Sequence, residues 1–458
     1  MKKISRRKFL KASAASTAAF MILPRWVIGK EPGPNSIINV AVVGPGGRGT
    51  ACCRTFGRLD FTRNVAFADV DFERAKPMFD QFPDAKRFKD YRVMLDEMGK
   101  DIDAVAIATP DHAHYPAGAW SMACGKHVYI EKPLARTVWE TQELKRIAQK
   151  QKVITQMGNQ GHTFDGWRKL REWYEAGLLG EIEEIHQWTD RPVPGWWDQG
   201  ALPRPDGSEK VPEHLDFNLW LNVAPEQAYS GRLLPFKWRG MRDFGTSALG
   251  DMGCHFMDFG YSAFDLGFPT SITGTSTEFN DFSWPQQSSV VYEFPAKGSR
   301  KPVKLYWYDF SSKNKPKNVK GVEQEKIDSM ANGSIVVGSK RSALCEDPYG
   351  GNTRIWPLRE HQEMMKSKAF PEASIPRVEG GPHQEWARAI RDGVQPGSNI
   401  VDFSADFTAV VMMGLITNFF PGKKLDFDPK NLTFTNEPKA NEFLKSVYPY
   451  RKEFLPGI

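Results

Sequence analysis

The sequence predicts an α/β protein with two domains, because two different patterns follow one another along the chain. Between residues 36 and 160, short apolar strands alternate with helices, which is typical of right-handed βαβ units and a doubly wound parallel sheet. Further on, helices accompany segments of alternating polar and apolar residues, and from residue 270 these segments suit a mostly antiparallel sheet. We therefore expect a first domain over residues 36–160, an α+β domain over residues 161–440, and an aromatic tail over residues 441–458 that docks on a surface or a neighbouring subunit.

A glycine-rich turn directly follows the first predicted strand, which is short, apolar and β-branched. The turn reads GPGGRG (residues 44–49) and fits the pattern G-x-G-x-x-G, with a helix expected after it. Gly44 allows the tight turn, Gly46 lets the backbone approach a diphosphate, and Gly49 lets the helix pack close to the strand. The second strand ends at Asp69, whose carboxylate can accept hydrogen bonds from ribose hydroxyls. Together these parts predict a Rossmann dinucleotide site made by Gly44, Gly46, Gly47, Arg48, Gly49 and Asp69.

The acidic residues after the second strand favour NAD over NADP. Asp69 would repel a 2′-phosphate, and Asp71 adds a second negative charge nearby. No Arg or Ser stands directly after the strand to receive that phosphate. We therefore expect NAD, with NADP as the less favoured alternative.

Polar residues follow three further strands of the first domain at their C-terminal ends. Ligands in open α/β sheets bind beyond the carboxyl ends of the strands, so these residues are expected to face the cofactor. The candidate cofactor contacts are Thr109, Pro110, His112, Glu131, Lys132, Asn159 and Gln160.

These motifs together resemble the Gfo/Idh/MocA oxidoreductases, the family of glucose–fructose oxidoreductase and inositol dehydrogenase. The resemblance covers nearly all of the chain after residue 35, and its most specific local piece is Glu-Lys-Pro at residues 131–133. It implies an N-terminal Rossmann domain and a second domain with an open sheet. One face of that sheet would pack on helices, and the other would serve substrate and subunit contacts. A homo-oligomer, dimer or tetramer, is implied as well.

The resemblance also implies roles for three residues. Lys132 would lie near nicotinamide and substrate, where an ammonium orients a hydroxyl and favours its deprotonated form. Asp251 and His255, from the sequence G-D-x-G-x-H, are four residues apart and share one face of a predicted helix. By resemblance, His255 is the general base that takes the hydroxyl proton, and Asp251 binds a substrate hydroxyl or steadies the neighbouring charges. Trp238 and Arg239, just upstream, are further candidate substrate contacts.

We therefore expect an enzyme that oxidises a secondary hydroxyl of a sugar, sugar derivative or glycoside by hydride transfer to a tightly bound nicotinamide cofactor. A second reaction stays open, because some relatives use transient oxidation by bound NAD to hydrolyse or eliminate a glycosidic bond without net redox. A third possibility is a sugar sensor without activity, and the presence of the acid, the base and the lysine together argues against it. In each case the ligand is a small carbohydrate.

A long segment over residues 191–225 lacks a regular pattern and is rich in proline and tryptophan. Loops of this length are usually functional or disordered, and the aromatic content argues against disorder. Trp196, Trp197 and Trp220 could lie against the C–H faces of a sugar, or could pin the loop to the body of the protein.

Composition and spacing argue against a metal centre, a disulfide framework and nucleic-acid binding. His112 and His114 form only a two-residue pair, and the Asp, Cys and His side chains of residues 251–258 do not converge on one ion. The five cysteines have no repeated spacing and are expected to be mostly buried thiols. The formal net charge of +6 becomes −2 without the eight basic residues among the first 30, so little positive charge is left to attract nucleic acid.

The first 30 residues carry no acid, and residues 5–11 read SRRKFLK, which looks like a twin-arginine signal. The Ala-rich run over residues 12–23 is too short and too small-sided for a stable membrane span. Residues 1–35 are thus expected to be a signal and linker, and the protein to be exported folded to the periplasm. Since free nicotinamide cofactor is scarce there, we expect it to be loaded first and held tightly.

Overall fold

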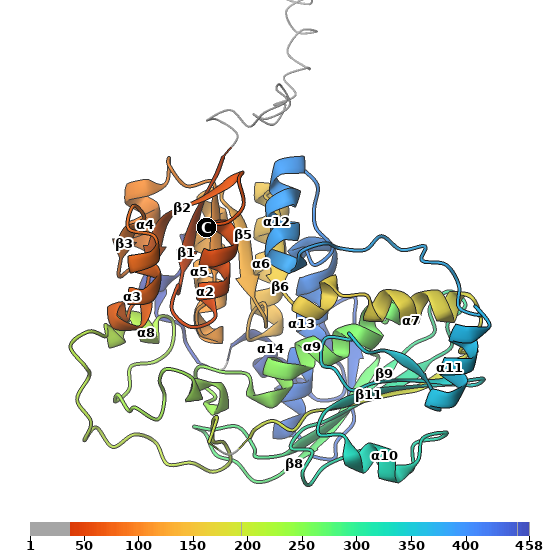
Figure 1. Ribbon diagram of the computed structural model, residues 1–458. Helices are drawn as coiled ribbons and strands as arrows, with labels where there is room; N and C mark the ends of the chain where they lie inside the picture. Colours follow the sequence, from red (N-terminus) through yellow and green to blue (C-terminus); the bar gives the residue numbers. More distant parts are fainter. Residues whose placement is uncertain (1–36, 194, 447, 458) are drawn as a thin grey trace, which may run out of the picture.

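The computed structural model of the protein describes residues 37–193, 195–446 and 448–457 (Figure 1). The expected twin-arginine signal lies outside these described residues. The described part folds around two sheets, with helices packed between them (Figure 1).

The first sheet has six parallel strands in the order β3-β2-β1-β4-β5-β6, as expected for a doubly wound fold. Its strands are β1 (Ile38–Val43), β2 (Thr62–Ala68), β3 (Lys86–Phe88), β4 (Ala104–Ile107), β5 (His127–Glu131) and β6 (Thr155–Gly158). The helices that connect them are α2 (Gly49–Phe56), α3 (Phe72–Gln81), α4 (Tyr91–Met98), α5 (His114–Ala123) and α6 (Val138–Gln151). The strand order changes direction between β1 and β4, which is the point where such sheets bind their ligands.

Successive residues of β1 pack on opposite faces of the sheet. Val40 and Val42 belong to the apolar cluster that contains the buried residues of α2 and α3. Ala41 and Val43 belong to the larger core, which contains the buried residues of α4, α5 and α6. Cover on both faces explains why the strand is apolar almost throughout. Helix α12 (Gly381–Asp392) completes the cover beside α2 and β6, although it comes from the range expected for the second domain.

The second sheet has nine strands in the order β13-β12-β11-β7-β10-β9-β8-β14-β15. They are β7 (Ile182–Trp188), β8 (Ser271–Ser276), β9 (Ser288–Phe294), β10 (Val303–Tyr308), β11 (Gly333–Gly338), β12 (Ser342–Cys345), β13 (Arg354–Trp356), β14 (Leu425–Asp428) and β15 (Thr433–Phe434). Only β7 and β10 pair in parallel, and the other neighbours run antiparallel. The predicted fold class is therefore confirmed.

Helix α9 lies at the centre of the molecule, because small residues let its neighbours approach closely. The later helices are α7 (Gly166–Glu175), α8 (Phe217–Leu221), α9 (Ser247–Phe264), α10 (Gln324–Ser329), α11 (Leu358–Lys366), α13 (Ala405–Ile416) and α14 (Glu442–Lys445). Helix α9 contacts α7, α13 and β7, and a Cβ added at Gly260 would lie 3.0 Å from the Ile185 side chain of β7. The helical stretch Ile400–Phe419 is long and apolar enough to cross a membrane, but 78% of its most apolar window is buried inside the fold.

The tail returns to the first domain of its own chain. Tyr450 donates a hydrogen bond to Glu140 of α6 at 2.5 Å, and Arg136 donates one to the hydroxyl oxygen of Tyr448 at 2.5 Å. Near the end of the chain, Phe454 is buried beneath the guanidinium of Arg92, whose carbon lies 4.1 Å from the ring centre. The expected aromatic docking surface is thus provided by the same chain.

The cysteines are mostly buried thiols, as expected. Cys52, Cys53, Cys254 and Cys345 are buried, whereas Cys124 at the end of α5 is exposed. All five lie in the described part of the chain and none of them forms a disulfide.

Candidate active site

A cavity of about 550 Å³ runs along the C-terminal edge of the first sheet toward α9. The glycine turn and Asp69 line it, and so do Lys132, Asp251 and His255. Residues more than two hundred positions apart in the sequence therefore face one space. Thr109, Pro110, Glu131, Gln160, Trp238 and Arg239, predicted as cofactor or substrate contacts, line the same cavity.

The glycine turn is as tight as the motif predicts. Gly44 has φ +79°, and a Cβ there would lie 2.8 Å from the carbonyl oxygen of Ala108. A Cβ at Gly49 would lie only 2.0 Å from the carbonyl oxygen of Gly44. No other residue fits at these two positions without a shift of its neighbours, and α2 begins at Gly49, so the positive end of the helix dipole lies at the turn. The turn therefore fits the diphosphate of a dinucleotide.

Asp69 stands at the end of β2, where the motif needs an acid. Its carboxylate accepts hydrogen bonds from the amide of Gly46 at 3.2 Å and from the amide of Asp71 at 3.0 Å. Burial raises the pKa of Asp69 to about 6, against the effect of these two hydrogen bonds.

Arg74 is a cavity residue that the sequence analysis missed. It lies in the first turn of α3, five residues after Asp69, and its guanidinium reaches back over the glycine turn. A Cβ at Gly47 would lie 2.5 Å from Nη2 of Arg74. A cation does therefore stand beside Asp69, although none follows the strand directly.

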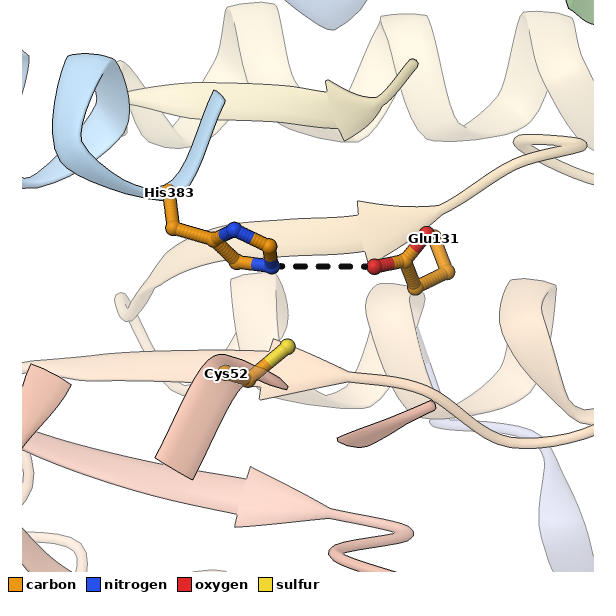
Figure 2. A group of neighbouring side chains, drawn as sticks. All are labelled: Cys52, Glu131 and His383. Carbon is orange, nitrogen blue, oxygen red and sulfur yellow. Dashed lines mark ion pairs between the residues drawn. The ribbon is translucent and has the colours of Figure 1, made fainter. Parts of the chain in front are cut away.

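Arg48 and Glu131 form an ion pair with Nε to Oε1 at 3.0 Å, which joins the glycine turn to the end of β5. His383 of α12 approaches the same oxygen at 3.7 Å, and Cys52 completes a buried group (Figure 2). The donor atoms of Cys52, Glu131 and His383 lie within 4.8 Å of one another, close enough for a metal ion. Arg48 already neutralises Glu131, however, and burial raises the pKa of the Cys52 thiol well above its usual range. We interpret this group as a structural tie between α2, β5 and α12.

Lys132 and Asp251 meet directly, which joins the first domain to α9. The Lys132 ammonium donates one hydrogen bond to the Asp251 carboxylate at 2.8 Å and another to the backbone carbonyl oxygen of Asp251 at 2.7 Å. Arg239 donates to the same carboxylate oxygen at 3.1 Å. Burial alone would raise the pKa of Asp251, but Lys132 and Arg239 outweigh burial and hold it well below its usual range. Asp251 therefore stays ionised and keeps the ammonium in place.

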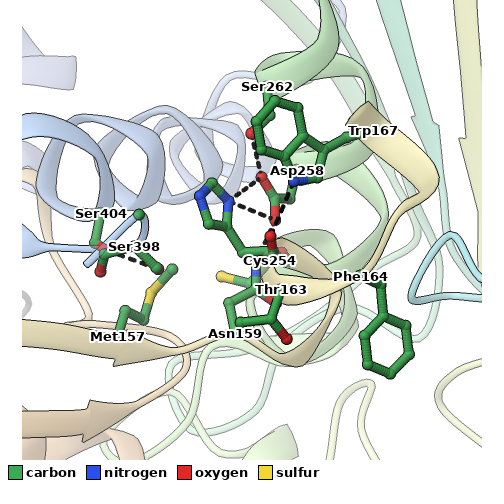
Figure 3. Close-up of polar contacts among 12 residues, drawn as sticks. Met157, Asn159, Thr163, Phe164, Trp167, Cys254, Asp258, Ser262, Ser398 and Ser404 are labelled. Atoms are coloured by element: carbon green, nitrogen blue, oxygen red, sulfur yellow. Dashed lines mark hydrogen bonds and ion pairs between the residues drawn. The ribbon is translucent and has the colours of Figure 1, made fainter. Parts of the chain in front are cut away.

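The orientation of His255 can be derived from its partner Asn159. The Asn159 amide nitrogen donates to the Cys254 carbonyl at 2.8 Å and to Asp258 at 2.9 Å, so its oxygen must be the acceptor for His255. Nδ1 of His255 lies 3.0 Å from that oxygen and carries the hydrogen. Nε2 is left with its lone pair, and it makes no hydrogen bond with the residues that the structure describes. Figure 3 shows the polar contacts that hold Asn159 and Asp258.

His255 is neutral in this environment. Burial lowers its pKa to about 3, and the nearby Lys132 ammonium adds to the effect. A neutral imidazole with a free lone pair beside an ammonium can accept a proton from a hydroxyl held between them.

Three predicted cofactor contacts do not line the cavity. Gly49 lies behind the turn, where its role is the close packing described above. Asn159 lies behind His255 rather than against a cofactor. His112 is fully buried: its Nε2 pairs with the carbonyl of Trp220 at 2.8 Å, and its ring packs on Phe244. His112 turns away because residues Asp111–Ala113 form a short 3₁₀ turn that presents Asp111 to the cavity instead.

The long loop supplies part of the cavity wall. Trp196 and Trp220 line the cavity, whereas Trp197 is 1% exposed and pins the loop to the body of the protein. Arg191 and Tyr349 also line the cavity, and the Tyr349 ring lies edge-on to His255 at 4.9 Å. No local pattern in the sequence distinguishes these last two residues.

Two family models match the chain. One, described as oxidoreductase family, NAD-binding Rossmann fold, covers residues 38–159, and the other, described as oxidoreductase family, C-terminal alpha/beta domain, covers residues 196–263. These two segments belong to the Gfo/Idh/MocA oxidoreductase family. The chain therefore carries a NAD-binding Rossmann domain, with the glycine turn and Asp69 at the positions that such a domain needs.

Curated relatives and solved structures resemble this oxidoreductase over different lengths. A "Glycosyl hydrolase family 109 protein" from Shewanella amazonensis is 28% identical over 47% of this chain and 52% of its own. "Inositol 2-dehydrogenase" from Salmonella paratyphi B is 28% identical over 27% of this chain and 36% of its own. The chain thus spans about half the length of the first relative and about a third of the second. The crystal structure of an aldose–aldose oxidoreductase from Caulobacter crescentus, complexed with glycerol, is 14% identical, covers 85% of this chain and 100% of its own, and has a TM-score of 0.56, which shows the shared fold.

Proposed function

We propose that this oxidoreductase oxidises a secondary hydroxyl of a sugar, sugar derivative or glycoside, with a tightly held NAD. The observation that carries the proposal is that Lys132 and His255, whose Nε2 has no hydrogen-bond partner among the described residues, line the same cavity as the glycine turn. An ammonium and a neutral base beside a dinucleotide site are the groups that alcohol oxidation requires.

The residues divide the work as follows. Two of the three ammonium hydrogens of Lys132 point at Asp251, and the third is available for the substrate hydroxyl oxygen. That contact lowers the pKa of the hydroxyl, and Nε2 of His255 receives its proton. The nicotinamide, when bound, supplies the acceptor for the hydride from the same carbon. Asp251 holds Lys132 and Arg239, and the turn, Asp69 and Arg74 hold the dinucleotide.

The test is an absorbance measurement on the purified protein. We expect bound NAD without any addition, and a rise near 340 nm when the right glycoside is supplied. If no sugar or glycoside in a broad panel reduces the bound cofactor, the redox proposal fails.

We also propose, from the pattern in residues 5–11, that the protein is exported folded with its cofactor already loaded.

A second candidate is cleavage of a glycosidic bond by transient oxidation without net redox. The family 109 relative, similar over about half of this chain, is the observation that favours it. Product analysis separates the two reactions. Free sugar released without accumulated ketone supports bond cleavage, and ketone formed in step with reduced cofactor supports net oxidation.

Asn159 should position the base without touching the substrate. Replacing Asn159 with alanine removes the acceptor that fixes the His255 ring, and misplacing a catalytic group by about an ångström can cost about 10²-fold. We expect kcat to fall by up to that amount with little change in KM, as steady-state kinetics on the holoenzyme would measure. Asn431→Ala, in an exposed turn, is the matched control. A rise in KM as large as the expected fall in kcat, with kcat itself unchanged, would contradict the positioning role.

Asp69 should select NAD over NADP. Replacing Asp69 with serine removes the carboxylate and leaves Arg74 beside the turn, so the NADP-to-NAD affinity ratio should rise by about tenfold or more. The measurement is fluorescence titration of each dinucleotide into cofactor-free protein. Adding Arg74→Ala to the variant should cancel the gain, and Asp84→Ser, on the surface, should leave the ratio unchanged. A ratio that does not move in Asp69→Ser would remove Asp69 from the selection.

A further inference from the structure

We propose that the substrate is an acidic sugar whose carboxylate pairs with Arg191. The inference rests on the proposed function, because it names the class of substrate that enters the same cavity.

Arg191 enters the cavity from the loop after β7, and its hydrogen-bonding capacity is largely unused. Nη1 donates to the sulfur of Met252 at 3.0 Å, and sulfur is a weak acceptor. Nε is buried and has no hydrogen-bond partner among the described residues. The nearest described carboxylate, of Asp190, lies 3.9 Å from Nε, which is beyond hydrogen-bonding distance. The side chain is only 19% exposed, so water satisfies little of the deficit.

The other cations at this end of the cavity already have partners. Lys132 and Arg239 share the carboxylate of Asp251. The Asp111 carboxylate accepts a hydrogen bond from the Thr246 hydroxyl at 2.6 Å, and burial raises its pKa. Arg191 is therefore the cation here that makes no hydrogen bond to a carboxylate of the described residues, since Asp190 lies 3.9 Å away, and the oxidised nicotinamide would add a further positive charge. A buried cation without an anion is costly, and a substrate carboxylate would remove that cost.

The position of Arg191 suits contact with a substrate that also reaches His255. Met252, which holds the guanidinium, follows Asp251 directly on α9. The guanidinium lies over the ring of Trp196 at 4.2 Å, and this fixes its plane. Trp196 is 48% exposed and lines the cavity, so it offers a flat apolar face beside the cation. A pyranose with a carboxylate on one edge matches this pair, since its C–H face can lie near the indole while its charge meets the arginine.

The test compares matched pairs of sugars on the NAD-loaded protein. Isothermal titration would use methyl glycosides of gluco, galacto and manno configuration, each as the neutral hexoside and as the uronate. We expect at least one uronate to bind about 10- to 100-fold more tightly than its neutral partner, as a charge-assisted hydrogen bond allows. Arg191→Gln should bring that ratio close to one, and Arg191→Lys should keep part of it. Arg359→Gln, on the exposed surface of α11, is the matched control and should keep the full ratio.

Two results would overturn the proposal. One is wild-type protein that binds all three neutral hexosides at least as tightly as the uronates. The other is an Arg191→Gln protein that keeps the preference while retaining its cofactor and its circular dichroism spectrum. Absorbance near 340 nm, followed in the same samples, separates this proposal from the redox proposal. If a uronate binds preferentially but never reduces the cofactor, only the redox proposal is refuted. If a neutral hexoside is oxidised and uronates are not preferred, only the proposal of an acidic substrate is refuted.

Discussion

Replacing His255 with alanine should lower kcat by about 10²- to 10⁴-fold, the usual contribution of a positioned general base. The neutral imidazole, with Asn159 on Nδ1 and a free Nε2, is the group placed to take the hydroxyl proton in our proposal. The measurement is single-turnover reduction of the bound cofactor at saturating substrate. The cofactor content should not change, because the His255 ring makes no hydrogen bond with the described residues of the glycine turn.

His361 provides the control for this variant. It lies on α11 and does not line the cavity, so His361→Ala should keep kcat near the wild-type value. A His255→Ala protein that reduces its cofactor at the wild-type rate would show that another group accepts the proton.

Replacing Lys132 with methionine should lower kcat/KM by about 10²- to 10³-fold, comparable to the loss of one preorganised donor at a developing oxyanion. The change removes the cation that lies nearest to Asp251, and it leaves Arg239 as the remaining partner of that carboxylate. It also removes a charge that lowers the pKa of His255, so that pKa should rise from about 3. The acid limb of the pH–rate profile should then move to higher pH, because a base with a raised pKa is protonated earlier as the pH falls.

The pH profile makes this prediction specific to the site. A merely structural role for Lys132 would reduce activity at every pH without moving the acid limb. Lys150→Met, at an exposed position on α6, removes a similar charge away from the cavity and should change neither the rate nor the profile.

Local patterns were enough to predict the first domain and the residues that face the cavity from strand ends. The glycine turn, Asp69 and Lys132 follow buried strands directly, so the strand geometry alone decides where they lie. Arg74, Arg191, Tyr349 and His383 could not be predicted in the same way, because each reaches its place through tertiary packing of a different element. His112 shows that a position near a strand end does not guarantee a place in the cavity, because one short turn directs its side chain into the core.

Asn159 shows why the role of a residue is harder to predict from the sequence than its position near the site. The sequence places it at the end of β6 beside the cofactor, and it does lie near the site. What it contacts is decided by α9, which brings Cys254, His255 and Asp258 to its amide from about a hundred residues away. Spacing within one domain carries no information about that meeting.

The position of Phe454 has a consequence for biosynthesis. Its ring forms part of the cavity wall, together with Lys89, Asp90 and Tyr91 near the adenosine side. A ribosome that has made the glycine turn must add some four hundred further residues before this wall can close. The cavity thus acquires its complete wall only when translation is almost over, and we expect it to hold a dinucleotide firmly only from then on.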